Sequence, residues 1–213
     1  MHIVIFANGR LSEPFLVPAG DLFIAADGGA RYCLELGLTP SVVVGDMDSI
    51  DEATEQRLLS AGTELIHHPA RKDYTDLELA LTYARDLGAT EISIIAALGA
   101  RWDQTLANLL LPASPEFKKT KIRLIDGCQE IQLIHGGETQ HITGSPGDTL
   151  SLIPIVGDAH GISTQGLEYP LHGGSLYIGS TRGISNVMLG KEVDIHLGEG
   201  LLICVHIRNS ESA

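Results

Sequence analysis

Short apolar runs alternate with helical patterns over the first 125 residues of this 213-residue chain. The runs are rich in β-branched residues and predict strands, and the segments between them carry apolar residues at helical spacing. Such alternation is typical of a mostly parallel sheet covered by helices. The predicted strands are 2–7, 22–26, 41–44, 64–67, 91–97 and 121–125, and the predicted helices are 30–36, 51–60 and 77–87.

The pattern changes after residue 128. Helical periodicity disappears, and short apolar runs are separated by turn sequences such as Gly-Gly, Ser-Pro-Gly-Asp and Gly-Glu-Gly, which is typical of all-β structure. The strands predicted here are 129–135, 149–155, 175–178, 192–196 and 201–207. We therefore predict a Rossmann-like α/β/α domain with a mostly parallel sheet over residues 1–126, followed by a small β-sandwich domain over residues 127–213.

Composition narrows the class of protein. A hydrophobic content of 44% is enough for a real core, and a net charge of -13 argues against nucleic acid as a partner, because phosphate backbones need clustered Lys and Arg. No run approaches the roughly 20 apolar residues of a membrane span, so no membrane association is expected. Three cysteines without Cys-x-x-Cys spacing predict reduced thiols and a cytoplasmic protein.

Five aspartates stand at the ends of apolar runs in the first domain. They are Asp27, Asp46, Asp48, Asp76 and Asp103. The carboxyl ends of buried parallel strands meet at one edge of the sheet, where α/β proteins bind ligands. Two carboxylates about 4 Å apart repel by roughly 4 kcal/mol at an effective dielectric near 20, so a cluster needs a cation or shared protons. The pattern predicts a hard divalent metal.

The segment Asp27-Gly28-Gly29 follows a predicted strand and opens a predicted helix. Its glycines would let the backbone approach a phosphate or a nucleoside, while Asp27 orients a polar group. A tight strand-to-helix turn without a ligand explains this segment equally well.

The pair Asp46 and Asp48 is more specific. Residues two apart in an extended segment point to the same face, so these two carboxylates can share a metal ion. The alternative is structural: Asp48 or Ser49 caps the helix that is predicted to begin at Asp51.

The segment from Lys72 to Glu78 carries a capping box, in which Thr75 and Glu78 cap the start of a helix. A helix cap does not explain why the charged residues Lys72 and Asp73 precede it. We therefore predict Asp76 as a third carboxylate for the metal and Lys72 as a phosphate contact.

A further candidate segment, Gly-Ala-Arg-Trp-Asp-Gln (residues 99–104), leaves an apolar strand and enters a helix. Here Arg101 could clamp a phosphate, and Asp103 could hold a substrate or simply cap the helix. The sequence has neither a P-loop nor a Gly-x-Gly-x-x-Gly motif, and its histidines lack zinc spacing.

Taken together, these motifs resemble the thiamine pyrophosphokinase family in order and spacing. The resemblance rests on Ala-Asp-Gly-Gly-Ala (26–30), Gly-Asp-Met-Asp-Ser (45–49), Lys-Asp-Tyr-Thr-Asp-Leu-Glu (72–78) and residues 99–104. It continues in Thr-Gln-Gly-Leu-Glu-Tyr (164–169) and Gly-Ser-Thr-Arg-Gly-Ile-Ser-Asn (179–186), which resemble the family's thiamine pocket. The chain departs from the family at Ala100, where glycine is usual, at Met47, where phenylalanine is commoner, and at Tyr169, which is tryptophan in some members.

The resemblance implies transfer of pyrophosphate from ATP to the hydroxyethyl group of thiamine, by a homodimer whose active sites lie at the subunit interface. It implies Mg²⁺ on Asp46, Asp48 and Asp76, with Asp48 or Asp76 as the proton acceptor. The phosphates of ATP would contact Lys72 and Arg101.

The remaining site residues follow from the same resemblance. Asp27 and Asp73 would orient metal-bound water or the nucleoside, with Gly28 and Gly29 beside ATP. Thiamine would contact residues of both domains, namely Asp103, Gln104, Tyr169, Ser185 and Asn186. Two alternatives remain open: a pyrophosphokinase for another heterocyclic alcohol, such as a hydroxymethylpterin, and a non-catalytic nucleotide or thiamine sensor.

Overall fold

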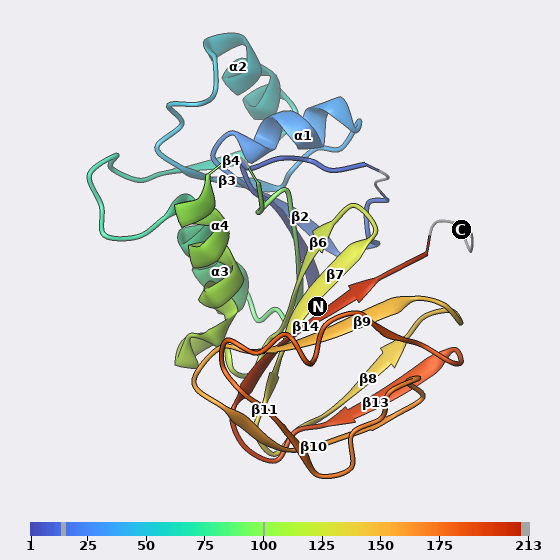
Figure 1. Cartoon of the computed structure of the whole chain (residues 1–213). Helices are drawn as coiled ribbons and strands as arrows, with labels where there is room; N and C mark the ends of the chain where they lie inside the picture. Colours follow the sequence, from blue (N-terminus) through green and yellow to red (C-terminus); the bar gives the residue numbers. More distant parts are fainter. Residues whose placement is uncertain (14–15, 100, 210–213) are drawn as a thin grey trace. The chain divides into compact units, whose positions relative to one another are not determined.

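The computed structural model describes residues 1–13, 16–99 and 101–209, so the departure at Ala100 lies outside the described residues. The chain divides into two compact units, Met1–Gly127 and a second unit that begins at Cys128. Figure 1 shows the elements of each unit. The first is a mixed α/β unit, and the second is rich in β-structure.

The first unit follows the alternation that the sequence predicts. Its elements are β1 (His2–Phe6), β2 (Leu22–Ala26), α1 (Gly29–Glu35), β3 (Val42–Gly45), α2 (Glu52–Ser60), β4 (Glu64–His67), α3 (Asp76–Asp86), β5 (Glu91–Ile95), α4 (Trp102–Leu110), the short 3₁₀ turns Leu111–Ala113 and Pro115–Phe117, and β6 (Lys121–Asp126). The strands are ordered β6-β5-β1-β2-β3-β4 and pair in parallel. The predicted parallel sheet is confirmed.

Helices cover both faces of this sheet. Figure 1 shows α1 and α2 over one face and α3 and α4 over the other. The buried side of α3 carries Leu77, Ala80, Leu81 and Ala84. The apolar spacing of the sequence extends this stripe to Leu87, but Leu87 is exposed and is the C-cap of the helix. Its N-cap is Thr75, whose hydroxyl accepts a hydrogen bond from the Glu78 N–H at 3.2 Å, as the capping box predicts.

The strand order reverses between β1 and β5. From β1 the chain adds β2, β3 and β4 on one side, and it then returns to add β5 and β6 on the other side. The connections after β1 and β5 therefore diverge, and this reversal point is where open α/β sheets bind ligands.

The second unit contains two antiparallel groups of strands. The elements are β7 (Gln129–His135), β8 (Thr139–Thr143), β9 (Thr149–Pro154), β10 (Ala159–Gln165), β11 (Gly174–Leu176), β12 (Asn186–Val187), β13 (Glu192–His196) and β14 (Leu201–Ile207). One group has the order β12-β9-β14-β7 and the other β11-β10-β13-β8. Both contribute to one core, for example through Leu152, Leu202, Ile162 and Ile195.

The sequence patterns missed three of these strands, β8, β10 and β12. Only Ile142 of β8 is buried, so β8 lacks an apolar run. A left-handed glycine, Gly161 with φ +68°, interrupts β10, whose pairing with β11 shifts register. The third, β12, has only two residues. None of the three presents the alternation by which strands are predicted.

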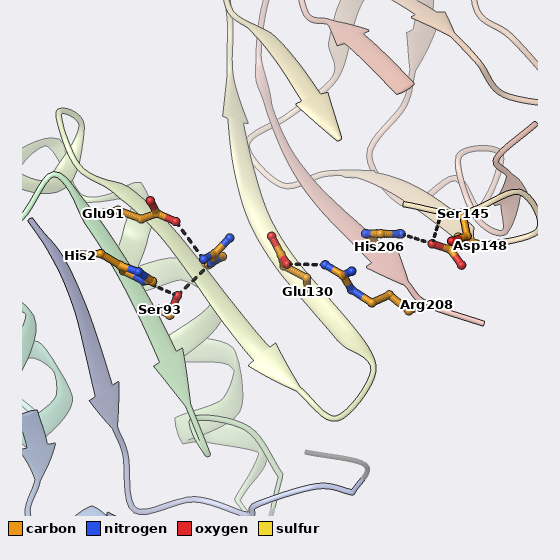
Figure 2. Close-up of polar contacts among 9 residues, drawn as sticks. His2, Glu91, Ser93, Glu130, Ser145, Asp148, His206 and Arg208 are labelled. Atoms are coloured by element: carbon orange, nitrogen blue, oxygen red, sulfur yellow. Dashed lines mark hydrogen bonds and ion pairs between the residues drawn. The ribbon is translucent and has the colours of Figure 1, made fainter. Parts of the chain in front are cut away.

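A buried acid and histidine stabilise the turn before β9. His206 Nε2 lies 2.8 Å from Asp148 Oδ2, and both side chains are almost fully buried (Figure 2). The Asp148 carboxylate also accepts hydrogen bonds from the N–H groups of Ser145 and Asn209. Burial by itself would raise the pKa of Asp148, but these hydrogen bonds outweigh it and lower that pKa.

We expect Asp148→Asn to lower the free energy of unfolding at pH 7 by about 1–3 kcal/mol, because a charged hydrogen-bond acceptor is lost. A carboxyl whose pKa is lowered by folding stabilises the protein above its unfolded pKa, about 3.9, and loses this effect as the pH falls through the folded value. Urea unfolding between pH 7 and pH 3 should therefore show the difference from wild type shrinking below about pH 4. A difference independent of pH would contradict this account. Asp158→Asn, at an exposed aspartate, is the control.

Two of the three cysteines are core residues. Cys33 and Cys204 are fully buried, and burial raises the pKa of each thiol to about 12. Cys128 is only partly buried, and all three are free. Among the described residues, no helix is long and apolar enough to span a membrane.

Candidate active site

Three carboxylates converge at the carboxyl edge of the parallel sheet. Asp27, Asp46 and Asp76 each place a possible ligand atom within 4.8 Å of those of the other two. Asp27 follows β2, Asp46 follows β3, and Asp76 begins α3. The prediction that strand-end aspartates meet is therefore confirmed for these three.

Backbone geometry makes this close approach possible. A Cβ atom on Gly45 would lie 2.9 Å from Asp27 Cβ and 3.2 Å from Asp76 Oδ1, so only glycine leaves room at the end of β3. Asp27 itself has φ +46°, which few non-glycine residues adopt. Met47 (φ +64°) and Ala96 (φ +54°), after β3 and β5, share this unusual conformation. Backbone strain of this kind clusters at functional sites.

Lys72 compensates part of the charge. Its Nζ lies 2.7 Å from Asp76 Oδ1 and 4.0 Å from Asp46 Oδ2. The contact with Asp76 is an ion pair but not a well-aligned hydrogen bond, so both atoms lack a hydrogen-bond partner although they are buried. Oδ1 of Asp27, a residue only 5% exposed, also lacks one within the described part of the chain. Three negative charges against one positive leave two in excess, and the bare, buried Oδ1 of Asp27 favours a cation.

The structure does not bring Asp48 into this cluster. The prediction assumed an extended segment, but the positive φ of Met47 turns the chain between the two aspartates. Asp46 Oδ1 instead accepts a hydrogen bond from the Asp48 N–H at 3.3 Å, and Asp48 is exposed. The capping alternative is also wrong, because Asp51 caps α2 by accepting from the Thr54 N–H at 2.7 Å.

Four other predicted residues of the first unit, Asp73, Arg101, Asp103 and Gln104, are exposed. Arg101 donates to Asp103 through Nε (3.1 Å) and Nη2, and this hydrogen bond is the main cause of the lowered pKa of Asp103 and of the raised pKa of Arg101. Asp103 is not the N-cap of α4, because Arg101 occupies that position. Gln104 and Asp73 lie on the surface. None of these four belongs to the three-carboxylate group.

The second unit has a pocket of about 320 Å³ that includes two of the predicted thiamine contacts, Tyr169 and Asn186. It is lined mainly by apolar side chains, and Arg182 is the one charged residue among the described residues of its lining. Tyr169 is 67% exposed, which leaves its ring accessible. The described residues of the lining are Leu150, Leu152, Thr164, Leu167, Tyr169, Pro170, Leu171, Leu176, Arg182, Gly183, Ile184 and Asn186.

The side chain of Asn186 forms two hydrogen bonds with the backbone of Tyr169. Asn186 Oδ1 accepts from the Tyr169 N–H at 3.0 Å, and its Nδ2 donates to the Tyr169 carbonyl at 2.8 Å. The same Oδ1 accepts from the Val187 N–H, so both of its lone pairs are used. This oxygen is therefore fully used within the chain, and a contact of Asn186 with thiamine stays a prediction. Ser185 does not line the pocket, and its N–H donates to Ser151 Oγ.

We expect Asn186→Ala to raise the KM for thiamine, the acceptor that the sequence predicts, about tenfold, which corresponds to about 1.4 kcal/mol, because the backbone of Tyr169 loses both side-chain hydrogen bonds. Asn186→Asp keeps an acceptor for the Tyr169 N–H and should have a smaller effect. Steady-state kinetics with varied thiamine would measure both. Equal KM values for all three proteins would contradict the role of these bonds.

Sequence reasoning missed Asn8, which follows β1 at the reversal point of the sheet. Its Nδ2 donates to Asp27 Oδ2 at 3.3 Å and to Ser49 Oγ at 3.2 Å, and its Oδ1 accepts from Arg31 at 3.1 Å. The signal that could have revealed it is the pair Asn-Gly directly after the first strand of an α/β pattern.

Comparisons with known proteins match both parts of the chain. Residues 16–124 match the family model described as "Thiamin pyrophosphokinase, catalytic domain", and residues 137–202 match "Thiamin pyrophosphokinase, vitamin B1 binding domain". Thiamine pyrophosphokinase of Bacillus subtilis is 34% identical over 86% of this chain and 86% of its own length. Thiamine pyrophosphokinase 1 of Arabidopsis thaliana is 28% identical over 92% and 82%.

Solved structures agree over the full length. The crystal structure of the Bacillus subtilis enzyme superposes with a TM-score of 0.87 at 30% identity, covering 98% of this chain and all of the other. That of Geobacillus thermodenitrificans thiamin pyrophosphokinase gives 0.85 at 26% identity, with full coverage of both chains. The fold and the matched models define a two-part protein with a catalytic domain and a vitamin-binding domain. This chain belongs to the thiamine pyrophosphokinase family.

Proposed function

We propose that this chain is a thiamine pyrophosphokinase, which transfers the pyrophosphoryl group of ATP to the hydroxyethyl oxygen of thiamine. The bond formed joins that oxygen to the β-phosphorus, the bond broken joins the β-phosphorus to the α,β-bridging oxygen, and AMP leaves. The observation that carries the proposal, beside family membership, is the group of Asp27, Asp46 and Asp76 with a bare, buried oxygen on Asp27.

We further propose that these three aspartates hold Mg²⁺. Their oxygen donors suit this ion, and the excess negative charge and the bare oxygen support its presence. When bound, the ion would neutralise charge on the phosphates of ATP. A role for Asp48 and Asp73 in this site stays a prediction, as does the choice between Asp48 and Asp76 as proton acceptor.

The chain's own contribution to the transfer is positioning and charge. Such reactions depend on in-line placement and on stabilising the charge of the phosphate oxygens. The ammonium of Lys72 stands among the carboxylates, where it would also meet a phosphate. Arg101 is paired with an exposed carboxylate, Asp103, so exchanging this partner for a phosphate costs little desolvation. Contact of Gly28 and Gly29 with ATP stays a prediction, since a Cβ atom at these positions would meet Asn8 and the carbonyl oxygen of Phe6.

The second unit would supply the acceptor pocket. Its apolar lining suits the rings of thiamine, and the exposed ring of Tyr169 can stack on the cationic thiazolium. A net charge of -13 favours the approach of this cation. In this proposal the first unit is a Rossmann-like nucleotide-binding domain (residues 1–126), and the second is a β-sandwich (residues 127–213) that binds thiamine.

We also propose a cytoplasmic homodimer with its active sites at the subunit interface. Free cysteines support a reducing compartment. Exposed apolar side chains of the second unit, among them Tyr169, Ile184 and Leu189, support an interface with a second copy of the chain. Light scattering on the purified protein would test the dimer.

The test of the function is a comparison of acceptors. The protein is incubated with ATP and Mg²⁺ and with either thiamine or a hydroxymethylpterin, and the products are separated by chromatography. We expect thiamine diphosphate and no pterin diphosphate. Pterin diphosphate alone would overturn the choice of acceptor, and thiamine monophosphate would overturn the choice of transferred group.

A further inference from the structure

We propose that Asn8 is a positioning residue for the carboxylate group: its amide, which lies against Gly28, fixes the orientation of Asp27. The inference rests on the proposed function, because it concerns the same metal-binding carboxylates. Nothing in the sequence motifs assigns a role to Asn8, since it lies outside the segments on which the family resemblance rests.

The first step concerns the oxygens of Asp27. The amide nitrogen of Asn8 has two hydrogens, and one of them is directed to Asp27 Oδ2 at 3.3 Å. Oδ1 of the same carboxylate is buried and has no hydrogen-bond partner among the residues that the structure describes. The bond from Asn8 therefore determines which oxygen is occupied and which remains free for a cation.

The second step concerns the link to Asp48. The other hydrogen of the Asn8 amide is directed to Ser49 Oγ at 3.2 Å, and that hydroxyl donates to Asp48 Oδ1 at 3.1 Å. One amide thus connects a carboxylate of the cluster with the aspartate that lies outside it. The ends of β1, β2 and β3 are joined by a single hydrogen-bonded chain.

The third step concerns the orientation of the amide. Asn8 Oδ1 accepts from Arg31 Nη2 at 3.1 Å, while Arg31 Nε donates to the Gly28 carbonyl at 3.3 Å. A guanidinium only donates, so the atom that it contacts must be the amide oxygen, and the nitrogen must face Asp27. Arg31 therefore prevents the amide from turning over.

The fourth step concerns Gly28, against which the amide lies. A Cβ atom at this position would lie 2.5, 2.6 and 2.7 Å from Oδ1, Nδ2 and Cγ of Asn8. The φ of Gly28 is -57°, which alanine adopts without strain. Gly28→Ala should consequently keep the fold and displace the end of the Asn8 side chain, and so reproduce the effect of Asn8→Ala.

The experiment is a double-mutant cycle on the binding of Mn²⁺ to the protein without substrates. Free Mn²⁺ is followed by electron paramagnetic resonance for wild type, Asn8→Ala, Gly28→Ala and the double variant, and urea unfolding verifies that each is folded. Loss of a residue that orients a metal ligand costs about 10–100-fold in metal affinity. We expect this loss in each single variant and no further loss in the double variant, because Gly28→Ala acts through Asn8.

The control is Thr63→Val, which removes another buried hydrogen bond, from Thr63 Oγ1 to the Pro40 carbonyl, just before β4. It should bind Mn²⁺ as wild type does. Wild-type affinity in Asn8→Ala would overturn this proposal alone, and so would losses that multiply in the double variant, since Gly28 would then act independently. A wild-type protein that binds no Mn²⁺ would overturn the metal assignment together with the proposal.

Discussion

Asp46→Asn is expected to lower kcat for thiamine-dependent AMP formation by on the order of 10²–10³, the usual effect of losing a group that stabilises the charge of the transition state. The substitution removes one of three clustered carboxylates and keeps the shape of the side chain. Because like charges repel in the metal-free protein, its melting temperature should equal or exceed that of wild type. The increase in melting temperature caused by Mg²⁺ should be largely lost.

The matched control is Asp51→Asn, five residues further along the chain. Asp51 caps α2, and asparagine caps helices equally well, so activity and the Mg²⁺ response should stay at wild-type values. Thermal unfolding with and without Mg²⁺, together with steady-state kinetics, covers both variants. An Asp46→Asn protein that keeps the wild-type Mg²⁺ response would show that this carboxylate does not bind the metal.

Lys72→Met should have the opposite effect on stability. Its ammonium is the cation that faces Asp46 and Asp76, and its side chain is only 13% exposed. Without it the metal-free protein should lose about 2 kcal/mol of unfolding free energy, since carboxylates remain partly buried with less compensation. Activity should fall on the order of 10²-fold, because a phosphate contact is also lost.

The stabilisation of Lys72→Met by Mg²⁺ distinguishes this account from a simple loss of structure. The ion no longer competes with an ammonium group in Lys72→Met, so it should stabilise the variant more than wild type. Urea unfolding at several Mg²⁺ concentrations measures this difference, with Lys119→Met, at an exposed lysine, as the control. An Mg²⁺ effect smaller than that in wild type would contradict the proposed placement of the ion.

The sequence was sufficient to predict the parallel sheet and the edge of that sheet at which the candidate site lies. Apolar runs followed by aspartate or glycine mark buried strands that end at one edge, and this periodic signal does not depend on distant contacts. The strands β1 to β6 were found within one or two residues. The strands β8, β10 and β12 were not, because their stability comes from partners that are distant in the sequence rather than from their own pattern.

The membership of the carboxylate group was only partly predictable. Asp46 and Asp76 lie in the group as expected, and Asp27 stands where Asp48 was expected; that these residues bind a metal stays a prediction. The reason is local: φ is positive at both Asp27 and Met47, and propensities do not predict this conformation for residues other than glycine. The hydrogen-bond partners of side chains could not be predicted from the sequence either. Examples are the bonds of Asn186 to Tyr169 and of Asn8 to Asp27.

The most direct test of the central claim, pyrophosphoryl transfer, is to identify the nucleotide product. Wild-type protein with ATP and Mg²⁺ is assayed for AMP and ADP, with thiamine added or omitted. The account predicts AMP that appears only with thiamine, in equal amount to thiamine diphosphate. ADP as the product would mean attack at the γ-phosphorus, and nucleotide turnover independent of thiamine would mean that thiamine is not the acceptor; either result would contradict the account.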